Sequence, residues 1–71
     1  MLWKGIYGYG RVFFHAPSQQ AAQLFISRWG QGFALGAPDT VKKCRDGDFT
    51  PPSADYTGGA YVMDRGVWVE Q

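Results

Sequence analysis

The stretch that decides the fold reads Lys4-Gly5-Ile6-Tyr7-Gly8-Tyr9-Gly10-Arg11-Val12-Phe13-Phe14-His15. Large aromatic or basic residues alternate with glycine and aliphatic residues along much of it. This alternation predicts one long strand over residues 3–15, because side chains two residues apart share a face of a strand. One face would carry Trp3, Tyr7, Tyr9, Arg11, Phe13 and His15, and the other Ile6, Gly8, Gly10, Val12 and Phe14. Successive glycines on one face usually mark the close approach of another backbone. We therefore expect the glycine face to lie against another element.

A helix is expected directly after this strand. Pro17 interrupts the strand pattern and Ser18 is a good N-cap, so the sequence predicts a helix over residues 19–29 that ends at Gly30. Its apolar residues fall on one arc of a helical wheel: Ala21, Ala22, Phe25, Ile26 and Trp29, with Leu24 at the edge. The small alanines would let this arc approach the glycine face of the strand. The rings on the opposite face would then point outward.

The rest of the chain predicts short strands joined by turns and one long loop. The expected elements are a strand over 40–45, a turn at Asp46-Gly47, a brief return over 48–50, a mobile loop over 51–59, and a hairpin of strands 60–63 and 67–70 around a turn at 64–66. Phe33 and Leu35 are expected to tether the segment 31–39 to the core. The order predicts a single α+β domain over residues 1–71, in which one helix covers one face of an antiparallel sheet of three to four strands.

Composition limits how so short a chain can be stabilised and what it can bind. Its 71 residues include one cysteine and one histidine, which excludes an internal disulfide and does not supply a zinc site, so we expect no cofactor. Three Trp, five Phe and four Tyr must build the core, either within a monomer or across a homodimer.

The net charge of +1 gives no bulk attraction to nucleic acid or to a membrane. The chain has neither an export signal nor a run of about 20 apolar residues, so we expect a cytoplasmic protein that is not in a membrane.

Candidate catalytic residues are few. A nucleophilic Cys44 would need His15 and an orienting carboxylate, and no protease or transferase motif surrounds it. Lys43 and Arg45 could lower the pKa of this thiol, but a structural role as a small strand residue in reach of the core explains Cys44 better. The aspartates occupy turns, where they are expected for backbone reasons. We therefore expect that the protein is not an enzyme.

Part of the opening stretch resembles a nucleic-acid-binding motif. The residues Tyr7-Gly8-Tyr9-Gly10-Arg11-Val12-Phe13-Phe14 are similar to the RNP1 motif of RNA-recognition domains, although Tyr7 replaces its leading basic residue and Arg11 its central aromatic one. In that family the motif lies on an interior strand after a first helix, whereas here it opens the chain. The resemblance implies that an aromatic sheet face with Arg11 could stack bases. Binding of single-stranded nucleic acid is therefore the alternative function.

A protein interface is the function that the sequence favours. Trp, Tyr, Phe and Arg are enriched at interaction hot spots, and they line the face that we expect to be exposed. The predicted partner-binding residues are Trp3, Tyr7, Tyr9, Arg11, Phe13, Lys42, Lys43 and Arg45. The same face could instead pack on the segment 31–39 or on a second copy of the chain.

The chain resembles a class of small accessory proteins in its format. Its size, single helix and lack of a catalytic motif are similar to those of small proteins from bacteriophages and mobile elements, such as anti-CRISPR inhibitors. This resemblance implies a cytoplasmic α+β domain that docks on a host protein or nucleoprotein complex and blocks a functional surface. It identifies no particular residue as functional.

Overall fold

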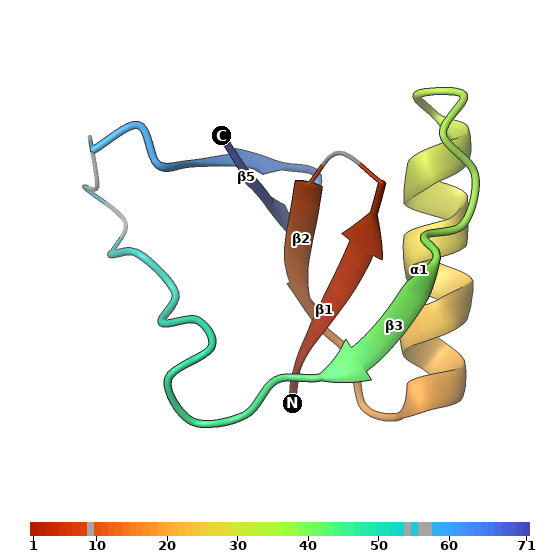
Figure 1. Cartoon of the computed structure of the whole chain (residues 1–71), viewed down its shortest axis with the longest axis horizontal. Helices are drawn as coiled ribbons and strands as arrows, with labels where there is room; N and C mark the ends of the chain where they lie inside the picture. The colour runs from red at the N-terminus through yellow and green to blue at the C-terminus, as the bar shows by residue number, and fades with distance from the viewer. Residues whose placement is uncertain (9, 54, 56–57) are drawn as a thin grey trace.

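Two strands, rather than one, form from the stretch that opens the chain. In the computed structural model, which describes residues 1–8, 10–53, 55 and 58–71, β1 (Leu2–Tyr7) pairs antiparallel with β2 (Gly10–His15) (Figure 1). Tyr7 pairs with Gly10, so the chain reverses between them. A hairpin with so short a connection favours glycine, and Gly8 is exposed there. The prediction of a single strand over 3–15 is therefore wrong, while Tyr9 lies outside the described residues.

The reversal changes which side chains share a face. Paired residues of antiparallel strands lie on the same face, so Tyr7 shares a face with Gly10 instead of opposing it. Trp3, Gly5 and Tyr7 of β1 therefore join Gly10, Val12 and Phe14 of β2. A continuous strand would have placed these two sets on opposite faces, because each residue added or removed reverses the orientation. The predicted face that combines Trp3 and Tyr7 with Arg11 and Phe13 does not exist.

The sheet is larger than the three to four strands predicted. Five strands are present among the described residues, in the spatial order β3-β1-β2-β5-β4, and all neighbours are antiparallel. The later strands are β3 (Thr40–Lys43), β4 (Tyr61–Asp64) and β5 (Val67–Glu70). β4 and β5 form the predicted hairpin, and its turn residues Arg65 and Gly66 both have positive φ, as a tight hairpin turn requires. The return strand predicted over 48–50 does not form. The opening hairpin supplies the additional strand.

Helix α1 (Gln19–Gln31) begins where the sequence predicts. The Ser18 side chain accepts a hydrogen bond from the Ala21 N–H at 3.2 Å, which confirms the N-cap. The helix runs beyond Gly30 and is capped by Gly32, whose N–H donates to backbone oxygens of the last turn. Figure 1 shows α1 beside β3 and β1, whereas the β4–β5 hairpin lies on the other side of β2.

The core lies between α1 and the face of the sheet that it covers. Its buried residues are Trp3, Tyr7, Val12, Phe14, Ala16, Ala22, Ile26, Trp29 and Val67. The predicted match between Gly8, Gly10 and the alanines is wrong, because a Cβ added at either glycine would meet nothing within 4 Å. Close approach occurs at Gly30 instead, where an added Cβ would lie 1.9 Å from the Gly36 carbonyl oxygen.

Candidate functional site

Three of the predicted partner-binding rings are buried. Trp3 is 6 % exposed and donates from Nε1 to the Ala16 carbonyl oxygen at 3.0 Å. Tyr7 is 9 % exposed and donates from its hydroxyl to the Gly36 carbonyl oxygen at 3.0 Å. Both belong to the core beneath α1, because the reversal after Tyr7 places Val12 and Phe14 on the same face as these two rings, and the helix covers that face. The prediction that they face outward is wrong.

Phe13 does lie on the face away from the helix, but it is not accessible. The Phe49 ring stacks on it at a centroid distance of 4.2 Å and an interplanar angle of 5°, and Tyr61 meets it edge-on at 6.0 Å. Trp68 packs against Phe49 at 5.4 Å. We call this group, Phe13, Phe49, Tyr61 and Trp68, the outer aromatic cluster. It leaves Phe13 with 0 % exposure, so the ring predicted to contact a partner is sealed by the chain itself.

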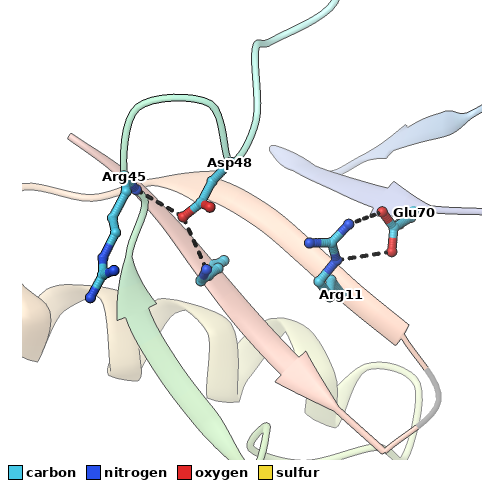
Figure 2. Close-up of polar contacts among 5 residues, drawn as sticks. Arg11, Arg45, Asp48 and Glu70 are labelled. Atoms are coloured by element: carbon cyan, nitrogen blue, oxygen red, sulfur yellow. Dashed lines mark hydrogen bonds and ion pairs between the residues drawn. The ribbon is translucent and has the colours of Figure 1, made fainter.

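Arg11 is exposed, but it already has a partner within the chain. Figure 2 shows its guanidinium facing the Glu70 carboxylate, with Nη2 2.6 Å from Oε2 and Nε 3.1 Å from Oε1. This two-point hydrogen bond lowers the pKa of Glu70. The guanidinium carbon also lies 5.5 Å from the centre of the Phe13 ring. A nucleic acid phosphate or an acidic partner would therefore have to compete with Glu70.

A second ion pair fixes the segment that carries Phe49. Asp48 accepts from Lys4 Nζ at 3.0 Å and from the Arg45 backbone N–H at 2.9 Å, as Figure 2 shows for Asp48 and Arg45. These bonds, first the one from the Arg45 N–H and then the one from Lys4, lower the pKa of the Asp48 carboxyl. Asp48 thus anchors the segment next to Phe49 to β1 beneath it.

The remaining predicted cations lie at the far edge of the sheet. Lys42 and Lys43 are exposed on β3, where Lys42 pairs with Lys4 and Lys43 pairs with Trp3, so they point to opposite faces. Arg45 follows the strand and is also exposed. β3 therefore carries the charge that protects an edge strand from unwanted pairing. The structure does not gather the seven predicted residues that it describes into one surface.

Cys44 and His15 do not form a catalytic pair. Leu2 lies between them, because it pairs with His15 on one side and accepts from the Cys44 N–H on the other. Two strand spacings separate them, about 9.6 Å. Burial raises the pKa of the Cys44 thiol, which is the opposite of what a nucleophile needs. Within the described part of the chain, no three His, Cys, Asp or Glu side chains are grouped to hold a metal ion.

An accessible apolar groove lies on the helix side of the β4–β5 hairpin. A groove of about 560 Å³ is bounded by the last turns of α1, the segment that follows it, and the two strands of the hairpin. We define the apolar groove by its five apolar side chains on the helix side, Trp29, Phe33, Leu35, Val62 and Val69. Met63 also borders the groove, although the strand register directs its side chain to the outer face. Asp64 and Gln71 complete its rim. Trp29 closes one end by donating from Nε1 to the backbone and carboxylate oxygens of Asp64, both at 3.2 Å.

The groove is open because the helix is placed off-centre on the sheet. Three of its side chains remain substantially exposed: Phe33 at 49 %, Leu35 at 38 % and Val62 at 49 %. Phe33 touches Trp29 with ring centres 5.0 Å apart and carries the Arg65 guanidinium at 4.7 Å. The contact with Trp29 thus ties Phe33 to the core, as predicted, although Phe33 and Leu35 also remain partly exposed at the groove. The one signal in the sequence was the adjacent apolar pair Val62-Met63, which must expose one residue on each face of an edge strand.

Comparison with known protein families, with curated proteins and with solved structures finds no match to this chain. Within the described residues, α1 is too short and too polar to cross a bilayer.

Proposed function

We propose that this chain is a non-enzymatic module that binds another protein through the apolar groove. The observation that carries the proposal is the exposure of Phe33, Leu35 and Val62 around one groove. Contiguous apolar surface of this kind typically marks an interface in a small protein. The polar rim of Asp64 and Gln71 around an apolar centre also has the composition of an interaction site.

The described contacts favour a protein partner over single-stranded nucleic acid. Base stacking needs accessible rings, whereas Trp3, Tyr7 and Phe13 are buried. Phosphate binding needs available cations, whereas Lys4 and Arg11 have carboxylate partners. The groove, by contrast, is apolar. The exposed Lys42 and Lys43 point to opposite faces of β3, so they do not form a continuous basic surface. The likeness to RNP1 and these scattered cations are all that favours nucleic acid binding.

The narrower prediction concerns the target. A phage-encoded inhibitor that docks on a host protein or nucleoprotein complex would use such a groove to cover a functional surface. This prediction rests on the format of the chain alone. Phage genes next to the one that encodes it would support the prediction, and a neighbourhood of host metabolic genes would argue against it.

Photo-crosslinking tests the groove directly. A benzophenone side chain placed at Phe33 should capture a partner in the cells that make the protein, whereas one at Gln23, on the polar side of α1, should not. With that partner purified, Leu35→Asp should weaken binding at least tenfold in calorimetry, because it places a charge at the rim of an apolar contact. The matched control is Leu24→Asp, which changes a leucine that is 57 % exposed outside the groove. Equal effects of the two aspartates would contradict the proposal.

A further inference from the structure

The two edges of the sheet differ in what they present to a neighbour. β3 exposes Lys42 and Lys43, which keep a second strand away. β4 exposes Val62 and Met63 and contains no lysine, arginine or proline. Within the described residues, no strand pairs with the outer side of β4. An apolar edge without such protection is a template for an additional strand.

The hydrogen bonds of the hairpin fix which backbone groups of β4 point outward. The Gln71 N–H donates to the Ala60 oxygen at 2.9 Å, and the register pairs Val62 with Val69. Hydrogen-bonded and non-hydrogen-bonded pairs alternate in antiparallel strands, so Val62 directs its backbone groups to β5. Tyr61 and Met63 must therefore direct theirs to the open side. An incoming strand has the N–H and C=O groups of these two residues to bond.

We propose that the strand that pairs with β4 is the β4 of a second copy, arranged antiparallel about a twofold axis at Val62. This inference rests on the proposed function, because Val62 of β4 also lies at the mouth of the apolar groove. It identifies a second copy of the chain as the protein that binds at this side of the groove. In this register Tyr61 of each copy faces Met63 of the other, and each pair exchanges two backbone hydrogen bonds. The outward N–H and C=O groups of Tyr61 and Met63 in one copy are therefore all bonded by the same groups of the other copy.

Side chains and charge agree with this register. Val62 of the two copies meet on the helix side, at the mouths of the two grooves, while Tyr61 and Met63 meet on the outer face. Asp64 lies opposite Ala60, so the carboxylates do not face each other. The net charge of +1 gives little repulsion between copies. The same arrangement at β3 would crowd Lys42 and Lys43 together.

The area available sets the strength of the dimer. A standard stable interface buries about 800 Å² on each partner. One four-residue edge with side chains that are about half exposed offers less than this. We therefore expect a weak dimer, with a dissociation constant of about 10 µM to 1 mM. Such a dimer forms where the protein is concentrated.

Sedimentation equilibrium tests whether the chain dimerises through the β4 edge. The wild-type chain should move from 7.9 kDa toward twice that mass as its concentration rises to about 1 mM. Met63→Pro removes an outward N–H without removing a bond to β5, so it should keep the protein monomeric. Lys43→Pro is the matched control at β3, and should dimerise like the wild type. A wild-type chain that stays monomeric, or a Met63→Pro chain that dimerises equally well, would overturn the proposal.

Disulfide trapping tests the register without relying on proline. In a Cys44→Ser background, Val62→Cys should form an intermolecular disulfide rapidly, because Cα atoms of a facing non-hydrogen-bonded pair are about 4.5 Å apart. Met63→Cys should not, since the two copies of residue 63 lie about 7 Å apart along the strand. Cross-linking through residue 63 instead of 62 would contradict the register. If neither cysteine cross-links while Leu35→Asp still weakens binding of the captured partner at least tenfold, the second copy is wrong and the proposed function stands.

Discussion

The two faces of the sheet are covered in different ways. On one face, α1 places Ala22 and Ile26 over the strands, and the core extends across four strands and the helix. On the other, one ring from an irregular segment, Phe49, covers Phe13. The first cover is a regular element held along its length, whereas the second depends on one ring and the anchor at Asp48. The helix face should therefore supply most of the stability, and the outer face should open first.

The largest effect is expected at Phe14 on the helix face. Phe14 has 0 % exposure and packs against Phe25 with ring centres 5.5 Å apart. Phe14→Ala should lower the free energy of unfolding by about 3–5 kcal/mol, because it leaves a cavity in the core. Urea denaturation followed by circular dichroism measures this loss. If Phe14→Ala does not fold, Phe14→Leu should still fold and lose about 1.5 kcal/mol or less. A loss below about 1 kcal/mol for alanine would contradict the comparison of the faces.

The next largest loss of stability is expected at Gly30, and it tests how tightly the end of the helix is packed. Gly30→Ala should cost about 2–3 kcal/mol, because the added Cβ would lie 1.9 Å from the Gly36 oxygen and 2.8 Å from the Tyr7 hydroxyl. The usual preference of helices for alanine acts in the opposite direction and is smaller, about 1 kcal/mol. Gly10→Ala is the control, since its Cβ would meet nothing within 4 Å, and should change stability by about 0.5 kcal/mol or less. Similar values for the two glycines, measured in the same urea titrations, would show that the close approach is absent.

A smaller loss is expected on the outer face. Phe49 is half-buried, so Phe49→Ala should cost about 1.5–2.5 kcal/mol, roughly half the value for a fully buried ring. It should also expose Trp68, whose fluorescence should shift to longer wavelength, and the shift should vanish in a Trp68→Phe background. Phe33→Ala is the matched control, because its ring is 49 % exposed and should cost about 1 kcal/mol or less. A larger loss for Phe49→Ala than for Phe14→Ala would reverse the ranking of the two faces.

The same contrast explains what the sequence could and could not predict. Ser18 and the apolar arc of residues 19–29 predicted the helix well, because a cap and a helical period are local signals. The turn at Arg65-Gly66 and strands β4 and β5 were also predicted from local alternation. The prediction for the opening stretch failed because the alternation of side chains in the sequence continues through a tight turn almost unchanged. The turn nevertheless reverses the face to which every later side chain points. No local signal pairs Phe49 with Phe13, which lie 36 positions apart in the chain and meet only in the folded sheet.

The candidate site was hidden from the sequence for a related reason. Aromatic residues predicted a contact surface, but the same residues are what a chain of 71 residues needs for a core. The groove instead involves Phe33 and Leu35, whose exposure depends on where α1 lies across the sheet. The sequence predicted the lysines of β3 as partner contacts. They lie on an edge strand of the sheet, where such charge discourages pairing with another chain.

The smallest expected effect is the pH dependence of the anchor beneath Phe49. Hydrogen bonds from the Arg45 N–H and from Lys4 hold the pKa of Asp48 below its ordinary value in the folded chain, so folding favours the ionised carboxylate. This contribution is fully present above about pH 4, the pKa of an unperturbed aspartate, and is lost as the pH falls through the lowered value. Acidification from pH 6 to pH 3 should therefore lower Tm, and the difference should be smaller in Asp48→Asn. Glu70, whose pKa is also lowered, titrates in both proteins and cancels in the comparison. Identical acid sensitivity of the two chains would show that the outer cover is held by Phe49 packing alone.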